Sequence, residues 1–338
     1  MMERIPFDAL RELAVAALTV HGASPGVSAE VARALVTAEA EGNTVCGLVY
    51  LPIFCAHLDS GKMDGRAEPQ VLERAPGAIE VDACHGFAHP AFAAGLPKLI
   101  VAARANGIAA MSVAHSYNAL ALSDPVVTLV EAGLIGLACS NAPASVACPG
   151  SKRPMFGTNP LAFGVPSADG EHIVFDQSSS AVSRTAVRMR AEKGESIPLG
   201  WAQDREGKPT TDAKQGYEGA LLPSGGQKGA NVAFMVEMLA AGLSGSSPST
   251  RAGSLAIPDG PRPDLGQLVL AIDPGHFAGS AVASLAASLA TGLRQDGLRP
   301  PGARRRESLT RSHTEGIPVS APTLERVRLL ARRPESSV

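Results

Sequence analysis

Apolar residues recur at helical spacing near the start of the chain. The sets 10–18 and 31–38 repeat every three or four positions, which predicts two amphipathic helices. Ser28 is the expected cap of the second helix, and Gly42 is its expected stop. A longer apolar run over 48–58 predicts a third helix.

The rest of the chain combines short apolar runs with further helical patterns. The expected strands are 78–81, 108–113, 134–140, 161–165, 172–176 and 267–273. The expected helices are 96–103, 123–131, 181–193, 232–243, 282–293 and 324–331. Arginines and a lysine make 181–193 basic, which is typical of a helix face in water. A chain of 338 residues with this pattern can form two or three lobes around a large core.

One stretch, 139–180, is poor in helical periodicity and rich in Gly, Pro, Asn and Ser. Within it, 156–160 is an expected tight turn that would present backbone N–H groups to a ligand. The strand that follows should deliver the carboxylate of Asp176. We interpret the stretch as a binding surface, with a β-rich core and well-formed turns as the alternative. Further on, 220–229 is a glycine-rich loop and 244–264 a long surface loop or flap.

Composition argues against several classes of protein. The 30 basic and 32 acidic residues give a net charge of −2, so no global field favours nucleic acid or an anionic membrane. No apolar run approaches the roughly 18 residues of a membrane span, and the amphipathic N-terminus is unlike a signal peptide, so a cytoplasmic location is expected. Five cysteines without a CxxC spacing argue against both a disulfide framework and a zinc site.

Neither GxGxxG nor GxxxxGK[ST] occurs, so short motifs alone do not suggest a nucleotide. Longer segments carry a resemblance to a known family through their order along the chain. They are NAP (141–143), FGTNPLAFGVP (156–166), FDQSSS (175–180), GESIPLGWAQDREGKPTTD (194–212), GALLPSGGQKG (219–229) and MVEMLAAGLSG (235–245). This order resembles the type-2 malate/L-lactate dehydrogenase family, with its L-sulfolactate dehydrogenase-like fold. The likeness covers essentially the whole chain and is closest to the piperideine-2-carboxylate/pyrroline-2-carboxylate reductases of that family.

The resemblance implies an α/β (α+β) fold. A mostly antiparallel, non-Rossmann sheet flanked by helices would bind NAD(P)H, and both chain ends would form a helical lobe. Three parts are expected: an N-terminal helical, substrate and dimerisation lobe (1–113), an NAD(P)H-binding domain (114–265) and a segment returning to the first lobe (266–338). The resemblance also implies a homodimer with active sites built across the interface.

The same resemblance assigns the cofactor-binding positions. NADPH contacts are expected from His115, Ser116, Asn141, Gly157, Thr158, Asn159, Pro160, Asp176, Gln177, Ser178, Gly226, Gln227, Lys228, Gly229, Arg304 and Arg305. The loop 226–229 at a helix N-terminus would offer N–H groups and one cation to a phosphate. The basic run 304–306 favours NADPH over NADH, and a solvated charge run is its alternative.

The catalytic positions depart from the family pattern. Relatives carry Ser-His-Gly and, four residues after the His, an Arg that helps to hold the substrate carboxylate; here Cys46 and Tyr50 stand at those two positions. His115, at the expected corner after strand 108–113, becomes the expected proton donor, although a structural histidine is the alternative. Cys46, Tyr50 and Asp176 complete the catalytic candidates. Cys46 is alternatively a small buried apolar group. The residues expected to contact substrate are Cys46, Tyr50, His57 and Cys148.

These changes predict a retained cofactor and a shifted substrate. We expect an NADPH-dependent reductase of a C=N bond, acting on a cyclic imine similar to piperideine- or pyrroline-2-carboxylate. An iminium already carries the charge that a carbonyl must acquire, so its reduction depends less on a strong enzymic acid. The alternatives are a 2-hydroxy-acid dehydrogenase of the malate/lactate type and a catalytically impaired dinucleotide-binding homologue. The expected partner is a small-molecule substrate, with no nucleic acid, membrane or metal.

Overall fold

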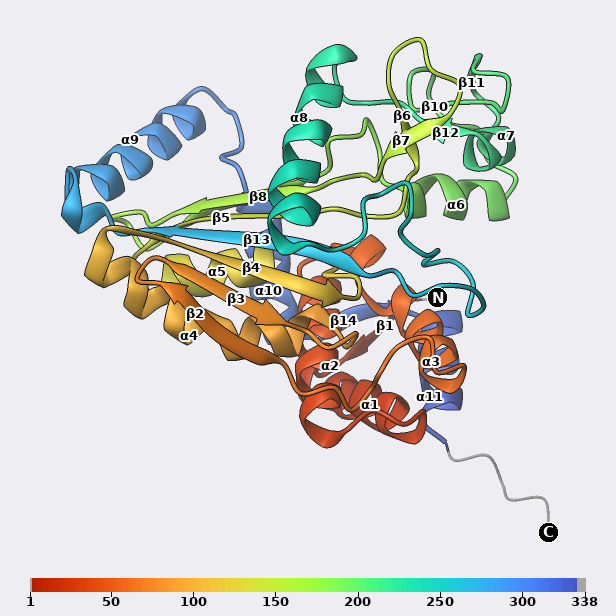
Figure 1. Cartoon of the computed structure of the whole chain (residues 1–338), viewed down its shortest axis with the longest axis horizontal. Coiled ribbons are helices and arrows are strands. Elements are labelled where there is room, and N and C mark those ends of the chain that lie inside the picture. Colours follow the sequence, from red (N-terminus) through yellow and green to blue (C-terminus); the bar gives the residue numbers. More distant parts are fainter. Residues whose placement is uncertain (1, 333–338) are drawn as a thin grey trace.

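A seven-stranded sheet forms the middle of the molecule (Figure 1), and the computed structural model describes residues 2–332. Its strands follow the order β2 (Gln70–Ala75), β3 (Ala78–Asp82), β4 (Ile108–Ser116), β13 (Leu265–Ile272), β5 (Ile135–Ser140), β8 (Leu161–Val165) and β9 (Ile173–Gln177). Every neighbouring pair is antiparallel except β3 and β4, which are parallel. The mixed α/β architecture predicted from the sequence is confirmed.

Helices pack on both faces of this sheet. One face is covered by α4 (Ala88–Asn106) and α5 (Ser123–Glu131), and the other by α8 (Gln227–Glu237) and the π-helix η3 (Met238–Gly242). Phe92, Leu96 and Leu99 of α4 are buried against the sheet, and each such side chain stabilises the fold by about 1.5–3 kcal/mol. Gly95 allows the close approach, because a Cβ at this position would collide with the side chain of Met111.

Both ends of the chain build a helical lobe beside the sheet. The lobe contains α1 (Phe7–Val20), α2 (Pro25–Ala40), α3 (Leu51–Asp59) and α11 (Ala321–Leu330). It also contains an antiparallel pair of strands, β1 (Met2–Ile5) and β14 (Ile317–Ser320). Leu10, Leu35, Phe54 and Leu324, which come from all four helices, are fully buried in one core. The first and last described segments therefore depend on each other for burial.

Two helix starts differ from the sequence prediction. Ser24, not Ser28, caps α2, because its Oγ accepts a hydrogen bond from the N–H of Val27 at 3.4 Å and Pro25 fits the first helical position. Ser28 instead lies buried inside the helix. The apolar run that begins at residue 48 first forms 3₁₀ turns, η1 (Thr44–Cys46) and η2 (Leu48–Tyr50), and becomes α-helical only at Leu51.

A second, smaller sheet stands apart from the central one (Figure 1). Its strands follow the order β11 (Pro209–Thr210), β10 (Ala202–Gln203), β12 (Ala220–Leu221), β6 (Val146–Ala147) and β7 (Pro154–Phe156). Helices α6 (Arg184–Glu192) and α7 (Ala213–Glu218) pack with it around a small core of Val146, Val187, Ile197 and Leu221. Strands β6 and β7 lie in the stretch 139–180 that we interpreted as a binding surface, and β12 lies in the predicted glycine-rich loop 220–229.

The remaining elements connect β13 to β14: η4 (Pro274–His276), α9 (Ala281–Gln295) and α10 (Ala303–Glu315). The expected boundaries after residues 113 and 265 fall inside β4 and β13, two strands that pair with each other. The segment after β13 does return to the helical lobe through β14 and α11. The three-part division itself stays a prediction. Within residues 2–332, none of the helices is long and apolar enough to span a membrane.

Candidate active site

A cavity of about 570 Å³ lies where the helical lobe, the central sheet and the small sheet meet. From the lobe, Cys46 and Tyr50 reach it on the two 3₁₀ turns. The central sheet contributes the ends of β5 and β9 and the segment 118–120 that follows β4, and the small sheet contributes the first turns of α6. Part of the loop 249–256 closes the remaining side. The volume is within the range of small-molecule and cofactor sites.

Asp176, near the end of β9, is the carboxylate of this cavity. Its Oδ2 accepts a hydrogen bond from the N–H of Ser123 at 3.2 Å. Burial raises the pKa of Asp176 to about 6, and the Ser123 bond and the charge of Arg305 oppose the rise. The group can therefore exchange a proton close to neutral pH, as an acid or base in this position must. The predicted delivery of Asp176 to a binding site by a short strand agrees with this geometry.

Cys46 and Tyr50, which the sequence placed at the acid/base and clamp positions, both line the cavity. Burial raises the pKa of the Cys46 thiol to about 12 and also raises the pKa of Tyr50. Both groups are therefore neutral near pH 7. Tyr50 Oη shares a hydrogen bond of 3.1 Å with Thr185 Oγ1 on α6, which ties the lobe to the small sheet. Such a thiol is a poor acid, so the geometry favours Asp176 as the proton-exchanging group.

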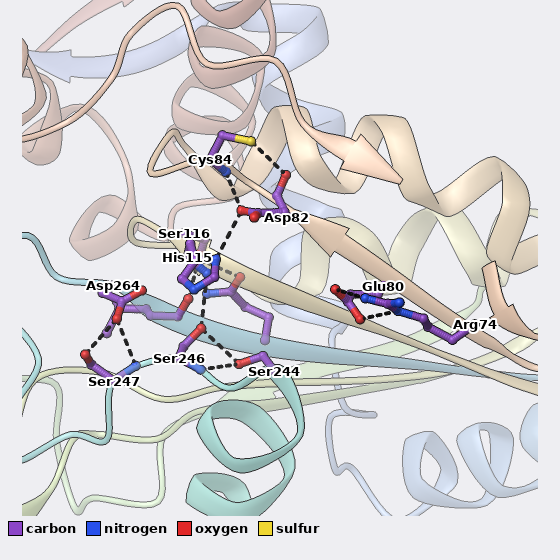
Figure 2. A network of polar contacts seen from close by, with 12 residues as sticks. Arg74, Glu80, Asp82, Cys84, His115, Ser116, Ser244, Ser246, Ser247 and Asp264 are labelled. Atoms are coloured by element: carbon purple, nitrogen blue, oxygen red, sulfur yellow. Dashed lines mark hydrogen bonds and ion pairs between the residues drawn. The ribbon is translucent and has the colours of Figure 1, made fainter. Parts of the chain in front are cut away.

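His115 lies at the end of its strand, as expected, but not in the lining of the cavity. Strand β4 continues to Ser116, so His115 is part of the strand, in a left-handed conformation with φ of 48°. Figure 2 shows its ring beside Asp82, with Nδ1 at 3.2 Å from Oδ1, while its N–H donates to Ser246 Oγ at 3.1 Å. His115 is not among the residues that line the cavity, in the part of the chain that the structure describes. The structure does not bring this expected proton donor to Asp176.

His57 and Cys148, expected near the substrate, also lie outside the lining of the cavity. His57 is buried in the lobe, where Nδ1 lies 2.6 Å from Tyr117 Oη, and burial lowers its pKa to about 4. It is therefore a neutral core residue near pH 7. Cys148 lies in the loop between β6 and β7.

The expected cofactor residues fall into two groups. Those that line the cavity are Asn141, Thr158, Pro160, Asp176, Gln177 and Ser178. Within residues 2–332, Gly157, Asn159 and Ser116 are not among the lining residues and make structural contacts instead. A Cβ at Gly157 would overlap the carbonyl of Ala142, while buried Asn159 donates to Ala233 O at 2.9 Å and to Glu237 Oε2 at 2.8 Å. Ser116 Oγ is buried between β4 and β13, at 2.7 Å from Gln267 Oε1.

The expected phosphate-binding groups lie away from this cavity. Residues Gly226, Gln227, Lys228 and Gly229 form the start of α8, outside the cavity lining. In the basic run, Arg304 is exposed, but Arg305 Nε lies 3.0 Å from Glu41 Oε2 in a largely buried ion pair. Arg306 pairs with Glu171 at 2.9 Å. The alternative of a solvated charge run is therefore wrong for Arg305, while Arg306 forms a partly exposed ion pair.

Sequence reasoning missed several residues of the cavity, above all Arg184 and Arg188 on α6. From the sequence, the charged side of the basic helix 181–193 is expected to face water. A spacing of four residues puts both arginines on the same side of a helix, and this was the signal that could have set them apart. Asn118 and the loop 249–256 carried no comparable signal.

Comparison with known proteins gives a consistent family assignment. The chain matches the malate/L-lactate dehydrogenase family over residues 5–328. It is 42% identical over 332 residues to a (2R)-3-sulfolactate dehydrogenase (NADP(+)) of Chromohalobacter salexigens, covering 98% of this chain and 99% of that protein. It is also 42% identical over 323 residues to a Delta(1)-pyrroline-2-carboxylate/Delta(1)-piperideine-2-carboxylate reductase of Pseudomonas aeruginosa, covering 94% and 96%.

A solved structure agrees in fold over the whole chain. The crystal structure of the delta1-piperideine-2-carboxylate reductase from Pseudomonas syringae pv. tomato superposes with a TM-score of 0.92. The two chains are 38% identical, with 97% of this chain and 99% of that one covered. The protein described here therefore belongs to the malate/L-lactate dehydrogenase family.

Proposed function

We propose that this protein is an NADPH-dependent oxidoreductase that reduces the C=N bond of a cyclic imine. The substrate would be similar to Δ1-piperideine-2-carboxylate or Δ1-pyrroline-2-carboxylate, and the product a cyclic amine. The observation that carries the proposal is a cavity lined by the partly buried carboxylate of Asp176 and by Cys46 and Tyr50, which the family resemblance puts at the positions of the relatives' histidine and arginine. Relatives named as reductases of these imines and as an NADP(+) dehydrogenase support it.

Polar groups of the cavity fit part of the cofactor, while the groups expected to hold its phosphates lie outside the cavity lining. The segments 140–145 and 156–160 lie in close contact, because Gly157 packs directly against the carbonyl of Ala142. Residues of both segments line one side of the cavity. Thr158, Gln177 and Ser178 would hold NADPH along this side through hydroxyl and amide groups. When bound, NADPH supplies the hydride. The non-Rossmann mode of binding on the mostly antiparallel sheet stays part of this proposal.

Asp176 would act on the nitrogen side of the substrate. An ionised carboxylate in a partly desolvated cavity stabilises a protonated imine, since the charge is not screened by bulk water. With a pKa of about 6, Asp176 is mostly ionised at neutral pH and can also pass a proton. Cys46 and Tyr50 would bound the ring as neutral groups. No strong acid is required of them, because the iminium is already electron-poor.

The test follows the loss of NADPH absorbance with both carboxylated imines. We expect the wild-type protein to reduce at least one of them, and Asp176→Asn to lower kcat by about 10²–10⁴-fold. His115→Ala is the matched comparison, and it should stay within about threefold of wild type. The proposal for Asp176 is contradicted if His115→Ala loses turnover and Asp176→Asn does not.

A second candidate is oxidation of a 2-hydroxy acid, favoured by the equal identity to the sulfolactate dehydrogenase. Incubation with NADP⁺ and (2R)-3-sulfolactate or malate tests it, and faster turnover there than on the imines would make it the function. Cofactor binding without turnover on either panel would indicate the catalytically impaired homologue.

We further propose a homodimer in the cytoplasm. Exposed apolar residues on α8 and α9, among them Phe234, Leu285 and Leu289, support the dimer.

A further inference from the structure

The cavity lacks an obvious partner for a substrate carboxylate in the helical lobe. Tyr50 is neutral, and its hydroxyl is already bonded to Thr185. A carboxylate that leaves water needs charge-assisted or several neutral hydrogen bonds, otherwise its desolvation opposes binding. A cation for a charge-assisted bond would come from another element that faces Tyr50. Helix α6 is that element, because Tyr50 contacts it directly through Thr185.

Arg188 lies on the side of α6 that faces the cavity. Ser183 caps the helix, with its Oγ accepting from the N–H of Ala186 at 3.1 Å, and Val187 is buried in the core of the small sheet. These two anchors fix the rotation of the helix, so that Arg188 lines the same cavity as Tyr50 and Asp176. Its positive charge also opposes the rise in the pKa of Tyr50.

The guanidinium of Arg188 is not satisfied by the protein. Its side chain is only 24% exposed, and its Nε is buried without a hydrogen-bond partner within residues 2–332. The carboxylate it pairs with, that of Glu192 one turn along the helix, lies 3.6 Å from Nε, and the Glu192 side chain is 65% exposed. A buried N–H that finds no acceptor costs about 1–3 kcal/mol, so a ligand that supplies one is stabilised there.

Arg184, the other cation of the cavity, is already engaged. Its Nη2 donates to the carbonyl of Tyr217 at 3.0 Å, and its guanidinium lies 4.5 Å from the centre of the Tyr217 ring. Both contacts hold it against the small sheet. Arg188 therefore remains as the cation with donor capacity toward a ligand.

We propose that Arg188 binds the carboxylate of the substrate and thereby makes this protein selective for carboxylated rings. This inference rests on the proposed function. The carboxylate clamp has moved from the helical lobe, where Tyr50 stands, across the cavity to α6. Arginine suits the task because it stays charged at every physiological pH and offers two parallel N–H groups to the two oxygens of a carboxylate.

The experiment compares a carboxylate with its neutral isostere in binding and in turnover. The binding probes are pyrrole-2-carboxylate and pyrrole-2-carboxamide, titrated by calorimetry into the protein with NADP⁺. The turnover substrates are Δ1-piperideine-2-carboxylate and Δ1-piperideine, which lacks the carboxylate. The variants are Arg188→Met, Arg188→Lys and Lys193→Met, the last removing an exposed cation near the end of the same helix.

We expect Arg188→Met to weaken carboxylate binding and to raise the KM of the carboxylated imine by about 10–100-fold. Binding of the amide and the KM of Δ1-piperideine should change by less than about threefold. Arg188→Lys should give values between those of the wild type and Arg188→Met, because lysine keeps the positive charge but lacks the two parallel N–H groups of arginine. Lys193→Met should match wild type.

Three results would overturn the proposal: unchanged carboxylate binding in Arg188→Met, an equal loss for carboxylate and amide, or the same selective loss in Lys193→Met. If Arg188→Met shows no cooperative thermal unfolding, Arg188→Lys alone decides, and wild-type carboxylate binding by that variant would refute the role. Failure of the wild type to reduce any imine would refute the proposed function instead. The titration with the two pyrrole probes still tests Arg188 in that case.

Discussion

At the scale of single residues, the molecule places ionisable groups where water is scarce. Burial raises the pKa of Asp176 to about 6, of Glu39 to about 6 and of Glu41 to about 7. The Glu39 carboxylate is held in place by the N–H of Leu48 at 2.9 Å, beneath the turn that carries Cys46, and Glu41 is held by Arg305. A raised carboxyl pKa means that the ionised form is disfavoured in the fold, so these groups lower stability once they ionise.

Asp176→Asn should therefore make the protein more stable at alkaline pH, even as it lowers turnover. The folded pKa of about 6 lies above the usual 3.8. Folded protein then holds the proton more tightly than the unfolded chain, so the aspartate weakens the fold as pH rises from about 4 to about 6 and remains unfavourable above that. We expect a gain of about 1–3 kcal/mol in the free energy of unfolding at about pH 8 and little gain near pH 4.

Urea unfolding at the two pH values measures this difference. Asp296→Asn, at an exposed carboxylate after α9, is the control and should change stability equally little at both. A loss of stability in Asp176→Asn at alkaline pH would show that the charge of Arg305 and the backbone hydrogen bond from Ser123, not desolvation, dominate.

At the scale of elements, one lysine fixes the loop that closes the cavity. Lys62 is 5% exposed, and its Nζ donates to the carbonyls of Ser254, Ile257 and Asp259 at 2.7, 2.8 and 3.0 Å. The loop 244–264 has no regular structure except near its start. The hydrogen bonds from Lys62 therefore hold the loop in place of the backbone hydrogen bonds that a strand would make. The sequence predicted this loop as a long surface loop or flap but gave no sign of its anchor, since Lys62 lies almost two hundred residues away.

Lys62→Met should loosen this loop without unfolding the sheet. The three carbonyls would lose their donor and exchange it for water, so local opening becomes easier while β13 stays paired on both sides. Hydrogen exchange followed by mass spectrometry should show faster exchange in peptides covering 250–260 by about tenfold or more, with β13 unchanged. We also expect a higher KM for the cofactor or the substrate.

Lys98→Met is the matched control, because Lys98 pairs with Glu73 on an exposed surface and should leave the exchange of 250–260 as in wild type. Equal exchange of that loop in Lys62→Met and wild type would show that other contacts hold it.

At the scale of the whole molecule, the sequence predicted most of the long elements and few of the contacts between them. Strand 161–165 and helix 123–131 have the predicted bounds, because local patterns suffice for elements that are apolar on one side. The two-residue strands β6, β10 and β12 were not predicted, because they are defined only by distant partners. The cavity was half predicted. Asp176 was predicted from the strand pattern, and Cys46 and Tyr50 through the resemblance, whereas α6 enters the cavity only through tertiary packing.

Exposed apolar side chains on α8, η3 and α9 are the surface that we expect to bury in the predicted homodimer. Phe234 on α8 and Met238 at the start of η3 are 56% and 48% exposed, and Leu285 and Leu289 on α9 are 60% and 59% exposed. Burying four such side chains per chain would contribute several kcal/mol to association, so at micromolar concentration the mass by light scattering should be twice the 34.6 kDa of one chain. One of two double variants, Phe234→Glu with Met238→Glu or Leu285→Glu with Leu289→Glu, should lower the measured mass to that of one chain, because a buried unpaired carboxylate opposes association.

Leu199→Glu, at an isolated leucine that is 71% exposed, should not change the mass. A wild-type mass of one chain at this concentration would contradict the homodimer, and a dimer that survives both double variants would place its interface elsewhere.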